Sequence, residues 1–297
     1  MKKRLISIIL GFFLLTFSLV TAEHCHNQSR IPFFGGARYD DIRRADIKES
    51  GHKGEHLKYS IGTAYLGSVV CYNPCREEGF TLSAAYTRTR LDWDENPEFD
   101  KSEYNTLSAS ISGFSNRLPD WEWKGNITFN IDTDSFDFEK YATWDLLLWG
   151  RYDYCNNLGL HIGFYSITGM KIDRVYPVIG FDWNCWRNLK INAVFPMDMS
   201  LIWVFNCKLE TGAAVRFFES RHRVGKNENL SMALWTYRTY GAELFLNFNY
   251  SEYIHANVHI GESLGGKLKI ADRHYGKAHH FRTKCAPYIG GEITLGY

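Results

Sequence analysis

A strict alternation of apolar and polar residues over Trp121–Thr133 (WEWKGNITFNIDT) constrains the fold more than any other feature of this sequence. Side chains of a β-strand point alternately to opposite faces, so one face of this segment is aromatic and apolar while the other is polar. A helix would mix the two sets around its surface. The apolar face must be covered by a protein core or by lipid, and we predict lipid.

Segments of the same kind recur along the chain, bounded by Asn, Gly, Pro, Asp or Ser, with no convincing amphipathic helix between them. They predict an all-β fold, an up-and-down meander closed into an antiparallel transmembrane β-barrel. The raw count of such segments is 16, but several of the late ones could merge or lie outside the sheet. Because bacterial single-chain barrels have even strand numbers, we predict about 12–16 strands, with 14 the best value. The candidate strands are 31–41, 58–72, 80–93, 104–115, 121–133, 141–154, 158–167, 175–184, 188–195, 199–205, 209–218, 230–237, 240–249, 253–261, 267–271 and 286–297.

The first 22 residues have the parts of a secretory signal peptide. Lys2–Arg4 forms a basic start, Leu5–Val20 is apolar, and the small residues of a cleavage site follow. We predict export with cleavage after Ala22, a periplasmic leader over residues 23–30 and a barrel domain over residues 31–297. The alternative is an uncleaved membrane anchor, because the apolar run is near the upper length for a signal peptide.

The composition fits a membrane barrel and argues against a nucleic-acid partner. Lys and Arg number 34 against 33 Asp and Glu, which leaves a net charge of only +1. Phe, Trp and Tyr make up 16% of the chain, and these residues favour strands. Beyond Val20 no run approaches the roughly 20 apolar residues of a membrane-spanning helix.

The connections alternate in length, and aromatic residues gather near strand ends. Outer-membrane barrels have short periplasmic turns, longer external loops and an aromatic girdle at each border of the membrane. The short turns are 73–78, 116–120, 156–157 and 185–187, and the mostly longer loops are 43–56, 94–103, 134–140, 168–174, 219–229 and 272–284. The candidate girdle residues are Trp93, Trp121, Trp123, Trp183, Trp186, Tyr240 and Tyr250.

The last segment carries the most specific pattern. Every second residue of this segment lies on one face, and the sequence stops at an aromatic residue. The residues on this face are Ile289, Gly291, Ile293, Leu295 and Tyr297. This pattern resembles the C-terminal assembly signal of Gram-negative outer-membrane barrels. The resemblance implies recognition by the barrel assembly machinery and insertion into outer-membrane lipid. Glu292 departs from it, because that pattern often has glycine there.

The face opposite the apolar one is predicted to line the lumen, and its charges are of both signs. A strongly ion-selective pore would need a constriction of one sign, so a weakly selective channel or a lumen braced by ion pairs fits better. The predicted lumen residues are Glu122, Lys124, Arg151, Asp182, Glu210, Arg216, Glu243, His255 and His259, together with Arg88, Asp132, Asp145, Lys190, Lys208, Lys267 and Lys269.

His255, Asn257 and His259 share one strand face, where a histidine could act as general base in a lipid-modifying barrel enzyme. No neighbouring nucleophile can be identified from the spacing. We therefore predict no catalytic, cofactor or metal site and no enzyme activity.

Seven cysteines are unusual for such a barrel. Five of them fall at predicted short turns and would gather at the periplasmic rim, while Cys285 would lie at the opposite end. Cys71 and Cys75 could bridge their own turn, and an odd total leaves at least one thiol free or bound to another chain. The five candidates for disulfides are Cys71, Cys75, Cys155, Cys185 and Cys207.

Cysteine use together with the last strand makes the chain similar to uncharacterised barrels of chlamydia-like bacteria. The expected function is an outer-membrane pore, transport protein or structural envelope component, with disulfides at its periplasmic rim that include links to other cysteine-containing envelope proteins. The alternatives are a barrel enzyme acting on lipid and a soluble, secreted all-β binding protein.

Overall fold

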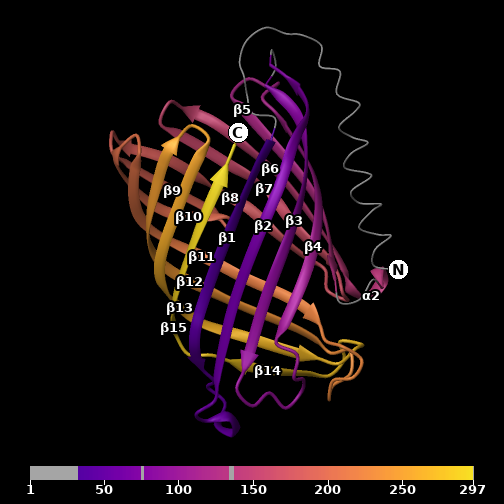
Figure 1. Ribbon diagram of the computed structural model, residues 1–297. Coiled ribbons are helices and arrows are strands. Elements are labelled where there is room, and N and C mark those ends of the chain that lie inside the picture. Colours follow the sequence, from indigo (N-terminus) through magenta and orange to yellow (C-terminus); the bar gives the residue numbers. More distant parts are fainter. Residues whose placement is uncertain (1–32, 75–76, 134–136, 297) are drawn as a thin grey trace. The chain divides into compact units, whose positions relative to one another are not determined.

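The computed structural model describes residues 33–74, 77–133 and 137–296, which form a β-barrel (Figure 1). Every strand pair is antiparallel, and the β12–β13 and β1–β15 pairings close the sheet. The strands are β1 (Phe33–Asp46), β2 (His56–Asn73), β3 (Glu78–Trp93), β4 (Glu103–Ser115), β5 (Trp121–Asp132), β6 (Ala142–Cys155), β7 (Leu158–Gly169), β8 (Arg174–Trp186), β9 (Leu189–Phe195), β10 (Asp198–Asn206), β11 (Leu209–Arg223), β12 (Leu234–Ser251), β13 (Ile254–Ala271), β14 (Ala278–Arg282) and β15 (Ala286–Leu295). A 3-10 turn, η1 (Ser50–His52), and a single helical turn, α2 (Phe138–Tyr141), lie in loops.

Fourteen strands form the closed ring, which confirms the predicted all-β meander and its best strand number. The fifteenth, β14, pairs with the end of β13 and continues the line of β15 along that strand. Among the described residues, no helix is both long enough and apolar enough to cross a membrane.

Alternation within each strand separates the outer face from the lumen. On β5, Ile127 is 51% exposed on the outer face, while Asn126 and Thr128 point inward. Phe129 packs across the outer face against Trp144 of β6, with ring centroids 4.7 Å apart. Such aromatic pairs on neighbouring strands stabilise a sheet by about 0.2–1 kcal/mol each.

Two strand boundaries were predicted wrongly. The segments 230–237 and 240–249 form one strand, β12, and the segments 253–261 and 267–271 form β13, each 18 residues long. The pairing of β12 with β13 shifts register at Thr239/Gly241 instead of breaking there. A β-bulge of this kind bends a strand without ending it, so the local signals for a turn were misleading.

The connections alternate as the sequence indicated. One end, called here the short-turn end, carries the turns after β2, β4, β6, β8, β10 and β12, and the other, the long-loop end, carries the loops after β1, β3, β5, β7, β11 and β13. The β9–β10 turn is the exception, because it points toward the long-loop end yet contains only residues 196–197. By the rule for outer-membrane barrels, the long-loop end faces the outside.

A packed apolar core fills the lumen at the long-loop end, where β11, β12 and β13 cross behind β1–β4 (Figure 1). Tyr59 of β2 packs on Tyr237 of β12 with ring centroids 4.8 Å apart, and Tyr104 packs edge-on to Trp235 at 5.0 Å. We call this cluster the mouth core. It comprises Ile42, Ala45, Ile47, Leu57, Tyr59, Leu91, Trp93, Phe99, Tyr104, Phe218, Val224, Ala233, Trp235, Tyr237, Leu268, Ile270, Phe281, Ala286 and Tyr288.

Both faces of β12 are buried at this level. Trp235 and Tyr237 enter the mouth core, while Leu234 packs on the other side against Met170 and Ile172 of the β7–β8 loop. A strand of an ordinary barrel wall has one face toward lipid. The end of β12 therefore lies inside the barrel, between the wall formed by β1–β4 and the β7–β8 loop.

Candidate functional site

The short β9–β10 hairpin leaves part of the wall without strand pairing. The pairing of β8 with β9 extends only from Trp186 to Ile179, and that of β10 with β11 only from Leu209 to Val215. In the described sheet, residues 174–178 of β8 and 216–223 of β11 thus have no strand partner on these facing edges. We call this part of the wall the seam.

Side chains join the two strands across the seam. Glu219, on the β11 face that points away from the mouth core, forms an ion pair with Arg174 and accepts a hydrogen bond from the hydroxyl of Tyr176 at 3.2 Å. Arg238 of β12 donates to Glu219 at 3.1 Å and to Tyr176 at 3.2 Å. Because Arg174 and Tyr176 belong to the inner face of β8, β8 overlaps β11 here as a separate layer. We call these four residues the seam cluster.

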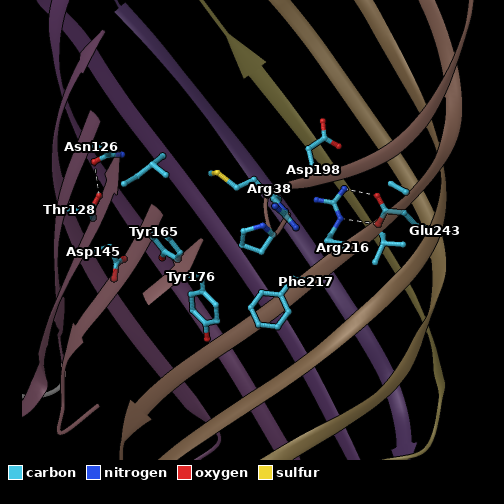
Figure 2. A pocket seen from close by; sticks show the side chains of 15 residues that line it. Arg38, Asn126, Thr128, Asp145, Tyr165, Tyr176, Asp198, Arg216, Phe217 and Glu243 are labelled. Carbon is cyan, nitrogen blue, oxygen red and sulfur yellow. Dashed lines mark hydrogen bonds and ion pairs between the residues drawn. The ribbon is translucent and has the colours of Figure 1, made fainter. Parts of the chain in front are cut away.

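Beside the seam lies a chamber of about 510 Å³, within the range of small-ligand cavities (Figure 2). Polar side chains of β5–β8 line one side, and the ion pair between Arg216 and Glu243 lines the other. The lining residues are Arg38, Asn126, Thr128, Asp145, Leu147, Tyr165, Tyr176, Pro196, Met197, Asp198, Ala214, Val215, Arg216, Phe217 and Glu243.

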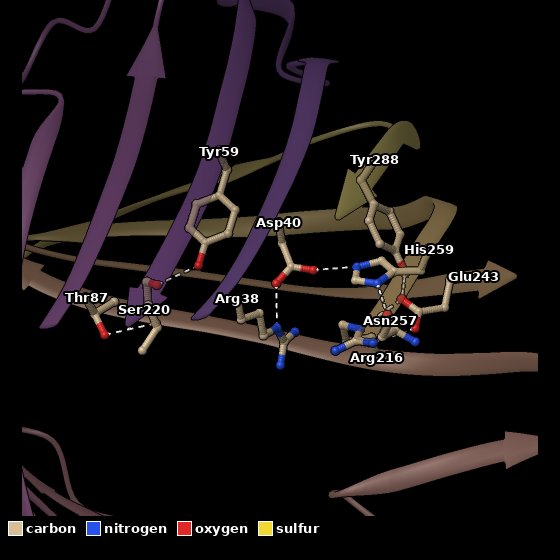
Figure 3. A network of polar contacts seen from close by, with 11 residues as sticks. Arg38, Asp40, Tyr59, Thr87, Arg216, Ser220, Glu243, Asn257, His259 and Tyr288 are labelled. Carbon is tan, nitrogen blue, oxygen red and sulfur yellow. Dashed lines mark hydrogen bonds and ion pairs between the residues drawn. The ribbon is translucent and has the colours of Figure 1, made fainter. Parts of the chain in front are cut away.

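A network of polar contacts joins residues of the chamber wall, among them Arg38 and Glu243, to Tyr288 of the mouth core (Figure 3). Asp40 bonds His259 Nε2 at 2.8 Å and accepts from Arg38 Nε at 2.7 Å. His259 Nδ1 bonds the side-chain oxygen of Asn257 at 2.7 Å. Buried charges of this kind are stable only when paired and hydrogen-bonded, so each partner holds the others in place.

Tyr288 links this network to the second ion pair. Its hydroxyl donates to Glu243 at 2.6 Å, and Glu243 also accepts from Arg216 Nε and Nη2 at 2.8 and 2.6 Å. Gly290 leaves space for the contact between Asp40 and His259. A Cβ at this position would collide with the His259 ring and lie 2.7 Å from Asp40 Oδ1.

Toward the short-turn end the lumen charges are paired but partly exposed. Arg151 donates to Asp182 through Nε at 2.8 Å and through Nη2 at 2.9 Å. Five more of the predicted lumen residues pair with near neighbours. These contacts are Glu122 with Lys124 at 2.7 Å, Lys190 with Glu210 at 3.3 Å, and His255 with Asn249 at 2.8 Å.

Three predicted lumen residues were assigned to the wrong face. Arg88 lies on the outer face of β3 beside exposed Tyr86, and pairs with Glu103. Lys267 and Lys269 lie away from the lumen, because Leu268, between them, enters the mouth core. Of the remaining predicted lumen residues, Asp132 is buried, Asp145 lines the chamber, and Lys208 lies in the β10–β11 turn.

The histidines considered for catalysis make structural contacts. Both ring nitrogens of His259 are occupied, by Asp40 and by Asn257. A general base needs a free nitrogen within reach of the proton that it removes, so His259 has no such capacity in this conformation. Among the described residues, no group of three or more His, Cys, Asp or Glu could hold a metal ion.

The cysteines lie where the turns lie. Cys71, Cys155, Cys185 and Cys207 are at the short-turn end, and Cys285 precedes β15 near the long-loop end. All five are free thiols, and all but Cys185 are exposed. Cys75, and with it the predicted Cys71–Cys75 bridge, lies outside the described residues.

The predicted assembly signal lies on the strand that closes the barrel. Ile293 and Leu295 are exposed on the outer face of β15, and they pair in register with Ala37 and Gly35 of β1. Tyr297 lies outside the described residues, as do the segments predicted to be a signal peptide and a leader.

A closed antiparallel barrel with an apolar outer face and a polar lumen is the fold of the transmembrane barrels of Gram-negative outer membranes. The sequence is similar to uncharacterized proteins of Chlamydia. It is 22% identical over 297 residues to one from Chlamydia pneumoniae, covering 94% of this chain and 91% of the relative. It is 19% identical over 235 residues to one from Chlamydia trachomatis serovar D, covering 74% of each.

No protein-family model matches the sequence. Among solved structures, an outer membrane channel from Pseudomonas putida F1 aligns over 93% of this chain and 100% of its own, with a TM-score of 0.49 and 8% identity. The KdgM porin in complex with disordered oligogalacturonate aligns over 89% of this chain and 99% of its own, with a TM-score of 0.36 and 7% identity.

Sequence reasoning missed the mouth core and the seam. One signal for the mouth core was present, because Ala233–Tyr237 (ALWTY) carries large apolar residues on both faces, Trp235 on one and Leu234 on the other, unlike a strand between lipid and water. For the seam, the signal was the short interval between Cys185 and Cys207, which holds a complete hairpin.

Proposed function

We propose that this chain is an outer-membrane transport barrel whose outer mouth is closed in the conformation described here. The observation that carries this proposal is a lumen face with partly exposed ion pairs toward the short-turn end, a polar-lined chamber, and a packed mouth core at the long-loop end. A purely structural barrel has no need of a chamber above partly exposed, paired charges. Passage to the outside would require the mouth core to loosen.

The pairing of the lumen charges supports weak selectivity. Each guanidinium of Arg38, Arg151 and Arg216 is balanced by a carboxylate. Ion selectivity requires an excess of one sign at the narrowest point. The proposed solutes are therefore small and polar, without strong preference for either sign of charge.

Conductance tests this proposal. The purified full-length chain is inserted into planar bilayers between unequal KCl concentrations, and single-channel currents and the reversal potential are recorded. We expect brief openings in which K⁺ and Cl⁻ permeate within about threefold of each other. Absence of any conductance, both in this chain and in a variant with a weakened mouth core, would overturn the proposal.

A second function, disulfide cross-linking of the envelope, is supported by the exposed free thiols at the short-turn end. Thiols at a periplasmic rim are in an oxidising compartment and within reach of other envelope proteins. We propose that some of them bond to neighbouring chains. Isolated envelopes run on gels without reductant should show larger species, which Cys155→Ser with Cys207→Ser diminishes and Cys285→Ser does not. Equal migration with and without reductant would refute the cross-linking.

We also propose that the chain reaches its membrane by export, cleavage after Ala22 and insertion by the barrel assembly machinery. The basic and apolar start and the exposed Ile293 and Leu295 on the closing strand support this route.

A further inference from the structure

We propose that the seam between β8 and β11 is a lateral opening, through which a membrane-dissolved amphiphile with an uncharged polar end enters the chamber. This inference rests on the proposed transport function and names a substrate class and a route for it. Its starting point is the short β9–β10 hairpin, which leaves edges of β8 and β11 unpaired over residues 174–178 and 216–223 in the described sheet.

Unpaired strand edges are costly in lipid, because each unsatisfied N–H or C=O group in hydrocarbon costs several kcal/mol. They are tolerated where they border protein or a water-filled cavity. The seam satisfies this condition, because Tyr176 from β8 and Arg216 and Phe217 from β11 all line the chamber. The unpaired edges therefore form the rim of the chamber.

The chamber extends around the edge of β11. Ala214 and Arg216 face the lumen side, whereas Val215 and Phe217 belong to the opposite face, and all four line the same cavity. A cavity enclosed by a continuous wall would contact only one face of a wall strand. The chamber thus passes from the lumen to the outer side of β11.

The outer surface beside the seam is apolar. Val175 and Ile179 of β8 are 68% and 61% exposed, and Met197 at the tip of the hairpin is 51% exposed. Met197 also lines the chamber. Such side chains suit contact with hydrocarbon and with the apolar part of an entering molecule.

The charges of the chamber indicate which polar end would be accepted. Asp40 and Glu243 already neutralise Arg38 and Arg216. Two further carboxylates of the chamber wall accept hydrogen bonds from neutral groups: Asp145 from Asn130 at 2.9 Å, and Asp198 from Asn192 and Ser200, both at 2.8 Å. At the seam, however, the single carboxylate of Glu219 faces the guanidiniums of Arg174, Arg221 and Arg238. Charges of both signs therefore line the route, and an uncharged polar end fits it best, because a charged end would lose its water without gaining a partner of its own.

The seam cluster holds the opening narrow. Glu219 is its centre, because Arg174, Tyr176 and Arg238 all bond to this carboxylate. Arg221 also lies 4.0 Å from this carboxylate, so removal of the carboxylate charge would leave three guanidiniums without their common partner. The layers of β8 and β11 should then separate more readily.

Photo-crosslinking tests the route. The full-length chain carrying Leu147→p-benzoylphenylalanine is reconstituted in liposomes that contain an alkyne-tagged dodecanol, irradiated, and assayed for attached probe. Leu147 lines the chamber from β6, so attachment reports entry. The same group at Leu244, which is exposed on the outer wall, shows that the probe reaches the protein surface. Attachment at Leu244 without attachment at Leu147 would overturn the proposal.

Variants that block the seam distinguish entry through the seam from entry through the water-filled lumen. Val215→Trp and Met197→Trp each narrow the seam, and should lower attachment at Leu147 about tenfold, as expected for roughly 1.4 kcal/mol of less favourable entry. Ile162→Trp, on the exposed outer face of β7, is the matched control and should change nothing. Heat-modifiable gel mobility confirms that each variant is a folded barrel. Unchanged attachment in both folded blocking variants would refute the seam as the route.

Two further comparisons test the role of the seam cluster and the preference for an uncharged polar end. Glu219→Gln should increase attachment at Leu147. A decrease or no change would refute the claim that the seam cluster holds the opening narrow. An alkyne-tagged dodecanesulfonate at equal membrane concentration should attach less than the alcohol, and equal attachment would refute the preference for an uncharged polar end. Conductance is measured on the same protein, so that conduction without attachment at Leu147 removes the lateral route and leaves the transport function standing.

Discussion

Trp235→Ala should open the outer mouth. Trp235 has 0% of its surface exposed, and its ring contacts those of Tyr104 and His222, each at a centroid distance of 5.0 Å. Truncation of a buried Trp to Ala costs about 3–5 kcal/mol through lost burial and the cavity left behind. The indole N–H has no acceptor among the described groups, so its removal recovers about 1–3 kcal/mol.

The net loss is about 2 kcal/mol, which corresponds to roughly a thirtyfold rise in the ratio of open to closed mouths. The barrel itself should persist, because β11 and β12 also pair outside the mouth core, from Leu209↔Phe248 at the short-turn end to Arg216↔Gly241. The readout is the open probability of single channels in planar bilayers. Trp183→Ala, which removes an exposed Trp of the outer face, is the matched control and should leave open probability unchanged.

A mouth core that never opens would give a different result. If Trp235→Ala lowers the free energy of unfolding by the expected amount and open probability does not change, the mouth core is a fixed part of the wall. The proposed gate would then lie elsewhere. If the variant and the Trp183→Ala control both raise open probability equally, the effect is a general loosening of the barrel.

Three further outcomes follow from the same features. Gly290→Ala should lower the unfolding temperature by displacing the His259 ring, whereas Gly276→Ala, with no atom closer than 3.8 Å to the added Cβ, should not; equal temperatures would argue against the buried network. Tyr297→Lys should reduce insertion, seen as loss of the heat-modifiable gel band, and an unchanged band would count against the assembly signal. Mass spectrometry of the mature chain should find its first residue directly after Ala22, and an intact apolar segment in inner membranes would contradict export with cleavage.

The strand pattern could be predicted from the sequence because water and lipid impose opposite demands on the two faces of a wall strand. Trp121–Thr133 shows this alternation without a break, and the strand observed there is Trp121–Asp132. The number of strands followed from repetition of the pattern. Where both faces of a strand meet protein, as at Leu234–Tyr237, the pattern loses its meaning.

For Lys267 and Lys269, the face of the strand was predicted wrongly because a bulge precedes them. The pairing of β12 with β13 passes from Gly241↔Ser263 to Thr239↔Gly266, so the bulge adds one more residue to β13 than to β12. His259 and Ser263 point inward before it, whereas Leu268 points inward after it. A single extra residue exchanges the two faces of the rest of a strand. Lys267 and Lys269 were assigned to the lumen for this reason.

Trp93 was placed in a membrane girdle because it ends a strand, as Trp183 nearly does. In the structure Trp93 is buried in the mouth core, packs on Phe281 at 4.7 Å and donates its indole N–H to Glu55 at 2.5 Å. A girdle residue and a core residue at a strand end differ only in which face they occupy and what lies opposite. The alternation of the sequence shows which face a residue occupies only within a stretch that contains no bulge. It does not show which element packs opposite that face.

Labelling of the native cysteines tests the arrangement of the barrel most directly. A membrane-impermeant maleimide is applied to intact cells of a Gram-negative host that makes the full chain, after mild reduction and washing, and modified sites are quantified by mass spectrometry. Cys285, near the long-loop end, should be modified on intact cells. Cys71, Cys155 and Cys207, exposed at the short-turn end, should be modified only after the outer membrane is permeabilised. Modification of all four on intact cells, or of Cys285 alone requiring permeabilisation, would contradict the account.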